Sequence, residues 1–197
     1  KSSGQWGLEE YPALTGLAVR SFLGHPSQSS LQKYKKTVDK GLNFVRTKVQ
    51  SDGGIYGKGL ASYNTSICMM ALMQAKFSED RSIISSARKF LVNQQSDFDR
   101  KGMADNVFDG GVGYGSRWAH SDLSNTHLAM EALFYAKKTL KEEEGTSIDL
   151  DWDAAISFVS KCQNLPSHNT EKWVSQHKDD KGGFVYFPGS SMAGEIE

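Results

Sequence analysis

The sequence lacks a net charge, a long apolar run and a cysteine framework. Lys and Arg together number 23, as do Asp and Glu, so the formal net charge is zero at pH 7 and we expect no nucleic-acid partner. No apolar run approaches the roughly 20 residues of a membrane helix, and no signal-peptide pattern is present, so we expect a soluble chain without a membrane span. The two cysteines, Cys68 and Cys162, are interpreted as buried free thiols, which leaves the compartment open.

Glycine, by contrast, is plentiful and gathers in four short stretches. Two of them are DGGIYG at 52–57 and DGGVGYG at 109–115, and looser versions are SGQWG at 3–7 and KGGFVYFPG at 181–189. Each stretch also carries an aromatic residue. Because glycine adopts backbone conformations closed to other residues, these stretches predict tight reversals between packed helices, with the aromatic ring filling the gap.

Two kinds of helical pattern alternate with the glycine stretches. Amphipathic runs that end in Gln precede them, as in GLNFVRTKVQ at 41–50, ARKFLVNQQ at 87–95 and AAISFVSKCQ at 154–163. Less charged runs follow them, starting at Tyr11, Tyr63 and Ser121. We therefore predict a single domain over 1–197, built from repeated pairs of an exposed outer helix and a buried inner helix.

The combined pattern A-x-x-F-L-x-x-x-Q followed by D-G-G-x-x-G resembles a known superfamily. It is similar to the Gln-Trp repeat of squalene and hopene cyclases and to the repeat of protein prenyltransferase β subunits. The segment SDLSNTHLAMEAL at 121–133 resembles bacterial prenyltransferase and squalene-oxidase repeat proteins. The resemblance implies an all-α fold, an α/α toroid of helical hairpins around a cavity. Because three inner helices are recognisable, we expect an incomplete arc of such a ring.

The resemblance also implies chemistry on an isoprenoid, either terpenoid cyclisation or prenyl transfer. Cyclases of this kind use an Asp-x-Asp-Asp acid motif, and the nearest string here, DLDWD at 149–153, is interpreted as a helix cap. Prenyltransferases bind zinc partly through Asp-x-Cys, whereas this chain has Asp122-Leu123-Ser124. Serine is a poor zinc ligand, so Zn²⁺ at Asp122 is an incomplete expectation and enzyme activity stays open.

Three polar residues near the start of the third inner helix are candidates for catalysis: Asp122, His127 and His120. Asp122 is also the candidate metal ligand. The alternative is structural, because Asp122 or Ser124 can cap the helix while His127 bonds to a neighbour.

Five large side chains on or near inner helices are candidates for contacting an apolar small molecule. They are Tyr63, Met70, Trp118, Met130 and Phe134. Their alternative role is as ordinary core residues. If they line a cavity, methionine and aromatic walls suit an isoprenoid or a similar apolar ligand. The competing hypotheses are an enzyme acting on such a ligand, a non-catalytic module that binds a lipid or a peptide, and a structural repeat array.

Overall fold

Helices dominate the fold, as the sequence predicts. The computed structural model describes residues 3–115, 118–141 and 148–189. The α-helices are α1 (Ala13–Leu23), α2 (Gln28–Arg46), α3 (Ala61–Ala75), α4 (Arg81–Val92), α5 (Leu123–Leu140) and α6 (Trp152–Lys161). Two 3₁₀ turns, η1 (Ser78–Asp80) and η2 (Lys178–Asp180), and two strands, β1 (Val112–Gly115) and β2 (Trp118–Asp122), complete the described elements. In the part of the chain that the structure describes, no helix has the length and apolar character to cross a membrane.

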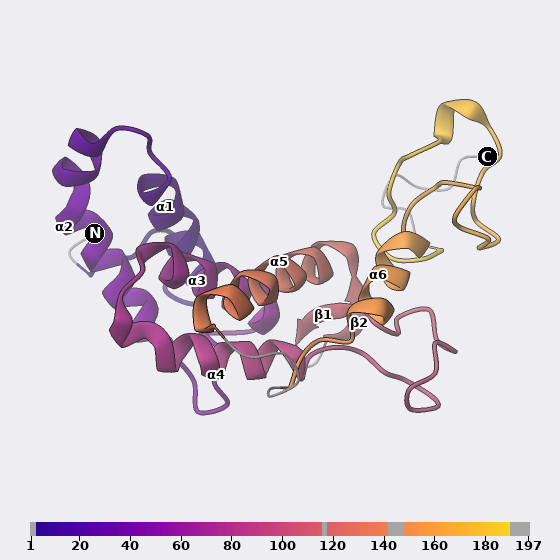
Figure 1. Cartoon of the computed structure of the whole chain (residues 1–197), viewed down its shortest axis with the longest axis horizontal. Coiled ribbons are helices and arrows are strands. Elements are labelled where there is room, and N and C mark those ends of the chain that lie inside the picture. The colour runs from indigo at the N-terminus through magenta and orange to yellow at the C-terminus, as the bar shows by residue number, and fades with distance from the viewer. Residues whose placement is uncertain (1–2, 116–117, 142–147, 190–197) are drawn as a thin grey trace.

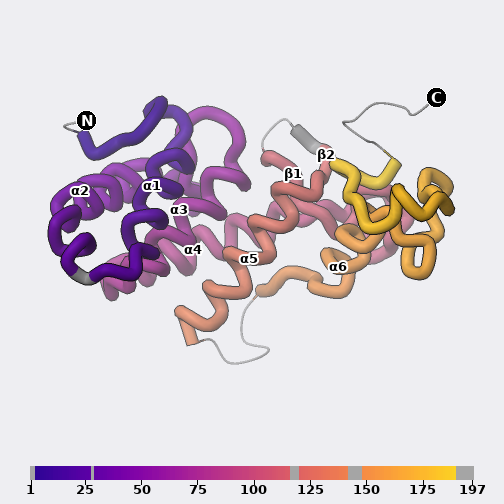
Figure 2. Tube along the Cα trace, turned by 90° about the horizontal axis from the view of Figure 1, so that it is seen from above, coloured from indigo at the N-terminus to yellow at the C-terminus, as the bar shows by residue number. Residues whose placement is uncertain are grey.

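Helix α3 is the centre of the arrangement. Both α1 and α5 pack on it, and α4 runs beneath α3 and α5 (Figure 1). Helix α2 packs on α1, and α6 packs on α5. The described part of the chain is elongated, with α2 at one end and α6 with residues 162–189 at the other (Figure 2).

Burial separates the helices into two kinds. Twelve of the fifteen residues of α3 are buried, and this helix carries no charged side chain. Helices α2 and α4 are instead amphipathic, with buried apolar residues on one face and most of their charged residues on the other; Arg88 of α4 is an exception and is buried. The apolar core is a cluster that surrounds α3, and it includes Leu42, Leu72, Leu91 and Leu133. Burial on all sides explains why the α3 sequence lacks a polar stripe.

The glycine stretches make closely similar contacts with helices. Gly4, Gly53 and Gly110 have φ angles of +84°, +89° and +81°, in the left-handed region that favours glycine. A Cβ added to any of the three would collide with a helix carbonyl oxygen, that of Lys40, Ser86 or Ala154 respectively. Each of these glycine turns therefore packs directly on the backbone of α2, α4 or α6.

A threonine near the start of α1, of α3 and of α5 holds the glycine turn that precedes the helix. The side-chain oxygens of these threonines accept a hydrogen bond from a turn backbone N–H, and all three threonines are fully buried. The pairs are Trp6 N to Thr15 Oγ1 at 2.9 Å, Ile55 N to Thr65 Oγ1 at 2.9 Å, and Val112 N to Thr126 Oγ1 at 2.8 Å. These bonds satisfy backbone groups that would otherwise be buried without a partner.

The glutamine at the end of the amphipathic runs bonds to the backbone of neighbouring segments. Gln50 Nε2 donates to Tyr56 O at 2.7 Å. Gln95 bonds to both backbone groups of Asp151, the N-cap of α6, accepting from its N–H and donating to its carbonyl oxygen at 2.8 Å each. Asp151 itself accepts from Ala154 N at 3.0 Å, so this residue of the DLDWD string is a helix cap.

One part of the secondary structure differs from the expectation. We expected residues 109–115 to form only a turn and the third inner helix to begin at Ser121. The structure instead pairs β1 with β2 in an antiparallel ribbon, with Val112 opposite Asp122 and Gly113 opposite Ser121, and α5 begins at Leu123. The sequence does not indicate this ribbon because glycine is unfavourable within strands and masks the pattern.

Candidate functional site

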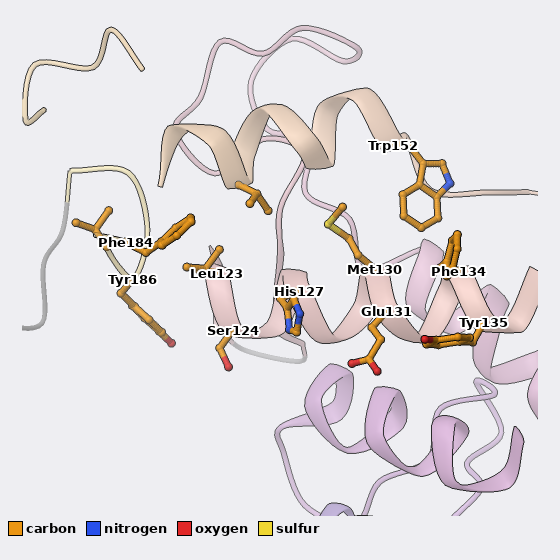
Figure 3. Close-up of a pocket in the computed structure, with 12 residues that line it drawn as sticks. Leu123, Ser124, His127, Met130, Glu131, Phe134, Tyr135, Trp152, Phe184 and Tyr186 are labelled. Carbon is orange, nitrogen blue, oxygen red and sulfur yellow. The ribbon is translucent and has the colours of Figure 1, made fainter. Parts of the chain in front are cut away.

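A groove between α5 and α6 is a wide hollow in the described residues. We call it the α5–α6 groove, and its volume is about 830 Å³. Five aromatic side chains line it, namely Phe134, Tyr135, Trp152, Phe184 and Tyr186. The other lining residues are Leu123, Ser124, His127, Met130, Glu131, Val159 and Val185. Figure 3 shows Met130 and Phe134 pointing from α5 toward α6, with Trp152 facing Phe134 from the opposite wall.

The helical period of α5 places these side chains together. Leu123, His127, Met130 and Phe134 follow one another at intervals of three or four residues, so they share one side of the helix. The opposite side consists largely of small buried residues such as Ala129, Ala132 and Ala136, and α5 packs there against α3 and α4. The packing of the small face therefore turns the larger side chains toward the groove.

The groove carries few polar groups. Ser124 and His127 are exposed at its wall, and Glu131 is half-buried. Glu131 pairs with Arg20 of α1, with 3.3 Å between Oε1 and Nη2. The remaining lining is apolar or aromatic, with Phe134 and Phe184 about half exposed at 48% and 55%. Such a wall suits a ligand that is mostly apolar and has few hydrogen-bonding groups.

A second, smaller cavity adjoins the groove. It has a volume of about 420 Å³ and is formed by α1, α3 and α5. Its lining residues are Arg20, Met70, Met73, Gln74, Lys76, Glu131, Tyr135 and Thr139. Glu131 and Tyr135 therefore line both hollows. We refer to this second hollow as the α1–α3–α5 cavity.

Equivalent positions of the three helices face the α1–α3–α5 cavity. Counted from Thr15, Thr65 and Thr126, the residue five positions onward is Arg20, Met70 or Glu131, and all three line this cavity. Gln74 and Tyr135, nine positions onward in α3 and α5, also line it. The same helical face is thus turned to the cavity in each helix.

The three candidate catalytic residues lie in different surroundings. Asp122 is fully buried as the N-cap of α5, where its carboxylate accepts from Asn125 N at 2.9 Å and from Asn125 Nδ2 at 2.7 Å. His120 packs among aromatic rings, with ring-centre distances of 6.1 Å to Phe108 and 5.8 Å to Phe187. His127 alone of the three lines the α5–α6 groove. The structure does not bring these three candidates together at that groove.

The zinc expectation at Asp122 lacks a ligand set. Within residues 3–115, 118–141 and 148–189, no group of three or more His, Cys, Asp or Glu side chains is placed to hold a metal ion. Burial and the charge of Asp122 raise the pKa of the Cys162 thiol to about 12. The Cys162 thiol is therefore protonated at neutral pH.

The candidate ligand-binding residues are distributed over several places. Met130 and Phe134 line the α5–α6 groove, and Met70 lines the α1–α3–α5 cavity. Tyr63 packs against the apolar core and lines neither hollow. The side chain of Trp118 lies outside the described residues.

Sequence reasoning missed Trp152, Tyr186 and Arg20 as wall residues. Trp152 begins α6 and Tyr186 lies in the last glycine stretch, where its carbonyl oxygen accepts from Leu123 N at 2.8 Å. Burial, followed by hydrogen bonding to Tyr114, raises the pKa of Tyr186, so its hydroxyl stays neutral. No signal in the local sequence connects these residues with α5, because their proximity depends on the tertiary packing.

Comparison of the chain with protein-family models, with curated proteins and with solved structures gave no match.

Proposed function

We propose that this protein binds an elongated apolar small molecule, an isoprenoid or a molecule of similar shape, in the α5–α6 groove. The observation that carries the proposal is the groove itself, about 830 Å³ in volume and walled mainly by aromatic and aliphatic side chains. This volume falls within the roughly 300–1,000 Å³ of pockets that hold small molecules. Met130 offers a polarizable side chain that adapts to irregular apolar surfaces.

We further propose that the helices form an arc of the α/α-toroid kind found in terpenoid cyclases and protein prenyltransferases. Support comes from the equivalent contacts of the glycine turns at Gly4, Gly53 and Gly110 and from the three buried threonines. It also comes from the matching face that α1, α3 and α5 turn toward one cavity. In this arrangement α1, α3 and α5 are the inner helices, and α2, α4 and α6 are the outer ones.

Within this proposal, binding is the function, and prenyl transfer or cyclisation is not part of it. Asp122 is supported as a helix cap by its two hydrogen bonds to Asn125. Of the titratable groove residues, Glu131 is held in an ion pair with Arg20. The apolar walls remove the apolar surface of the ligand from water, and this contribution to the free energy drives the binding of an apolar ligand.

The test is calorimetric titration of the protein with farnesol, using Phe134→Asp as the groove variant. Phe134 is 48% exposed, so the substitution spares the core, and Leu8→Asp at a 61% exposed site is the matched control. We expect farnesol to bind the wild type and Leu8→Asp equally. Phe134→Asp is expected to bind roughly tenfold more weakly or worse, because the ligand would have to strip water from a carboxylate.

The absence of farnesol binding to the wild type, or equal binding by Phe134→Asp, would contradict the proposal. Circular dichroism of both variants checks that their helix content matches that of the wild type.

A further inference from the structure

An ion pair stands where the two hollows meet. Arg20 of α1 and Glu131 of α5 are 3.3 Å apart, with side chains 29% and 31% exposed. Both helices pack on α3, and Met70 occupies the equivalent position on α3. The pair therefore links two helices that flank α3, and it lines the same cavity as Met70.

The wall between the hollows consists of few residues. Glu131 and Tyr135 are the two residues that line both, and Arg20 holds Glu131 from the side of the smaller cavity. Figure 3 shows Glu131 pointing away from the α6 side of α5, on which Met130 and Phe134 lie. Beyond this wall, the smaller cavity again offers apolar surface through Met70 and Met73.

We propose that the Arg20–Glu131 ion pair sets the maximum length of the ligand in the α5–α6 groove. The proposal rests on the apolar-ligand function put forward above. With the Arg20–Glu131 ion pair in place, an apolar chain fills the groove of about 830 Å³ and stops at the two charged side chains. Without the charges, the same chain continues into the adjoining 420 Å³.

The physical reason is desolvation. An ion pair that is about 30% exposed keeps part of its hydration, and an apolar chain passing over it would displace that water without replacing its hydrogen bonds. The pair itself contributes little to folding stability, because partly exposed ion pairs are weak. Neutral side chains at both positions should therefore change ligand length without unfolding the protein.

The geometry of α5 gives the length at which the limit applies. Along α5 the groove lining runs from Leu123 to Glu131 over about 12 Å and to Tyr135 over about 18 Å, so the wall shared with the smaller cavity occupies the last turn of the groove. An extended tetradecanol approximately reaches the far end of this shared wall, decanol falls short of it, and octadecanol exceeds it. These three linear alcohols are suitable probes because they differ only in chain length.

The test compares the wild type with the double variant Arg20→Met/Glu131→Gln. Affinities for decanol, tetradecanol and octadecanol are measured by displacement of the neutral fluorescent probe N-phenylnaphthylamine. The matched control is Lys35→Met/Asp39→Asn, which removes an exposed ion pair with 2.8 Å between Nζ and Oδ2 on α2. Thermal unfolding of each protein accompanies the binding curves.

For the wild type and the control, we expect affinity to rise from decanol to tetradecanol and then to stop rising. For Arg20→Met/Glu131→Gln, affinity should continue to rise with chain length. The double variant should bind octadecanol roughly tenfold more tightly than the wild type does, because each buried methylene adds to affinity. The same plateau in the double variant, or a wild-type affinity that still rises at octadecanol, would overturn the length limit while leaving the binding function standing. If no alcohol displaced the probe from the wild type, both proposals would fail.

Discussion

At the residue scale, Gly53 shows how closely a glycine turn approaches a helix. Its φ is +89°, and a Cβ built on it would lie 2.7 Å from Ser86 O of α4. Gly182 has the same φ of +89°, but a Cβ there meets no atom of the described residues within 4 Å. Both glycines therefore need a left-handed backbone conformation, but only Gly53 lies against a helix.

This pair gives a direct prediction about stability. Gly182→Ala should lower the free energy of unfolding by about 1 kcal/mol, the cost of a left-handed alanine. Gly53→Ala should lower it by about 2 kcal/mol more, because the turn must also separate from α4. Urea denaturation of both variants measures the difference. Equal losses would show that the close approach to Ser86 carries no energy.

Tyr56 provides a prediction for the dependence of stability on pH. Its hydroxyl donates to Asp52 Oδ2 at 2.6 Å, and this bond, followed by burial, raises the pKa of Tyr56 to about 12. The raised pKa means that folding favours the protonated phenol. This contribution is fully present below the unfolded pKa of about 10 and is lost as pH rises toward about 12.

We expect the free energy of unfolding to fall over that alkaline range more steeply in the wild type than in Tyr56→Phe. Denaturation midpoints measured at about pH 9 and about pH 11.5 give the two slopes. Asp52→Asn should flatten the slope in the same way, because it removes the charge that holds the phenol proton. Parallel slopes in the three proteins would assign the alkaline loss to other groups.

The sequence indicated those residues whose roles depend on neighbours along the chain. Asp151 as a helix cap follows from local spacing, because the DLDWD string directly precedes an amphipathic run. Arg20 and Trp152 did not stand out, because a partly exposed arginine or tryptophan gains meaning only from a partner far along the sequence. The partner of Arg20, Glu131, is 111 residues away.

At the element scale, α5 is the helix on which the site depends. Its N-cap Asp122 is fully buried, and Thr126 in its first turn bonds to β1 through Val112 N at 2.8 Å. These two residues fix the position from which Leu123, His127 and Met130 project into the groove. The start of α5 is therefore set by contacts that a free helix would not have.

Substitution of Asp122 separates a capping role from a metal role. Asp122→Ala should lower the free energy of unfolding by about 2 kcal/mol, at the upper end for caps because the site is buried. Asp122→Asn retains one oxygen that can accept from Asn125 N but loses the acceptor for Asn125 Nδ2, so it should lose less stability than Asp122→Ala. Differential scanning calorimetry with and without a zinc chelator makes the measurement. A chelator-dependent melting temperature in the wild type that disappears in both variants would favour the metal role instead.

Elements also show where sequence patterns are sufficient and where they are not. Helix α3 was predictable because a run of small and apolar residues without charge is typical of a helix packed on all sides. The β1–β2 ribbon was not, since VGYG has two glycines among four residues and lacks the usual strand composition. The groove required the fold, because α5, α6 and residues 184–186 each supply part of its wall.

At the scale of the whole molecule, burial of α3 and the exposure of the α5–α6 groove are two consequences of one arrangement. The helices α1 and α5 cover α3, and α4 packs beneath α3 and α5. The larger side chains of α5 then face α6 and the segment around Tyr186 across the groove (Figure 3). Large apolar and aromatic side chains consequently recur along α5 from Leu123 to Tyr135, which suits an elongated ligand.

Photoaffinity labelling tests this central claim most directly. The protein is irradiated with a tetradecanol analogue that carries a diazirine near its chain end, digested, and analysed by mass spectrometry. We predict that labelled peptides come from residues 123–135, 152–159 and 184–186, and that unlabelled tetradecanol suppresses the labelling. Labelling concentrated on α2 or on residues 97–109, or labelling that the competitor does not reduce, would contradict the assignment of the α5–α6 groove as the binding site.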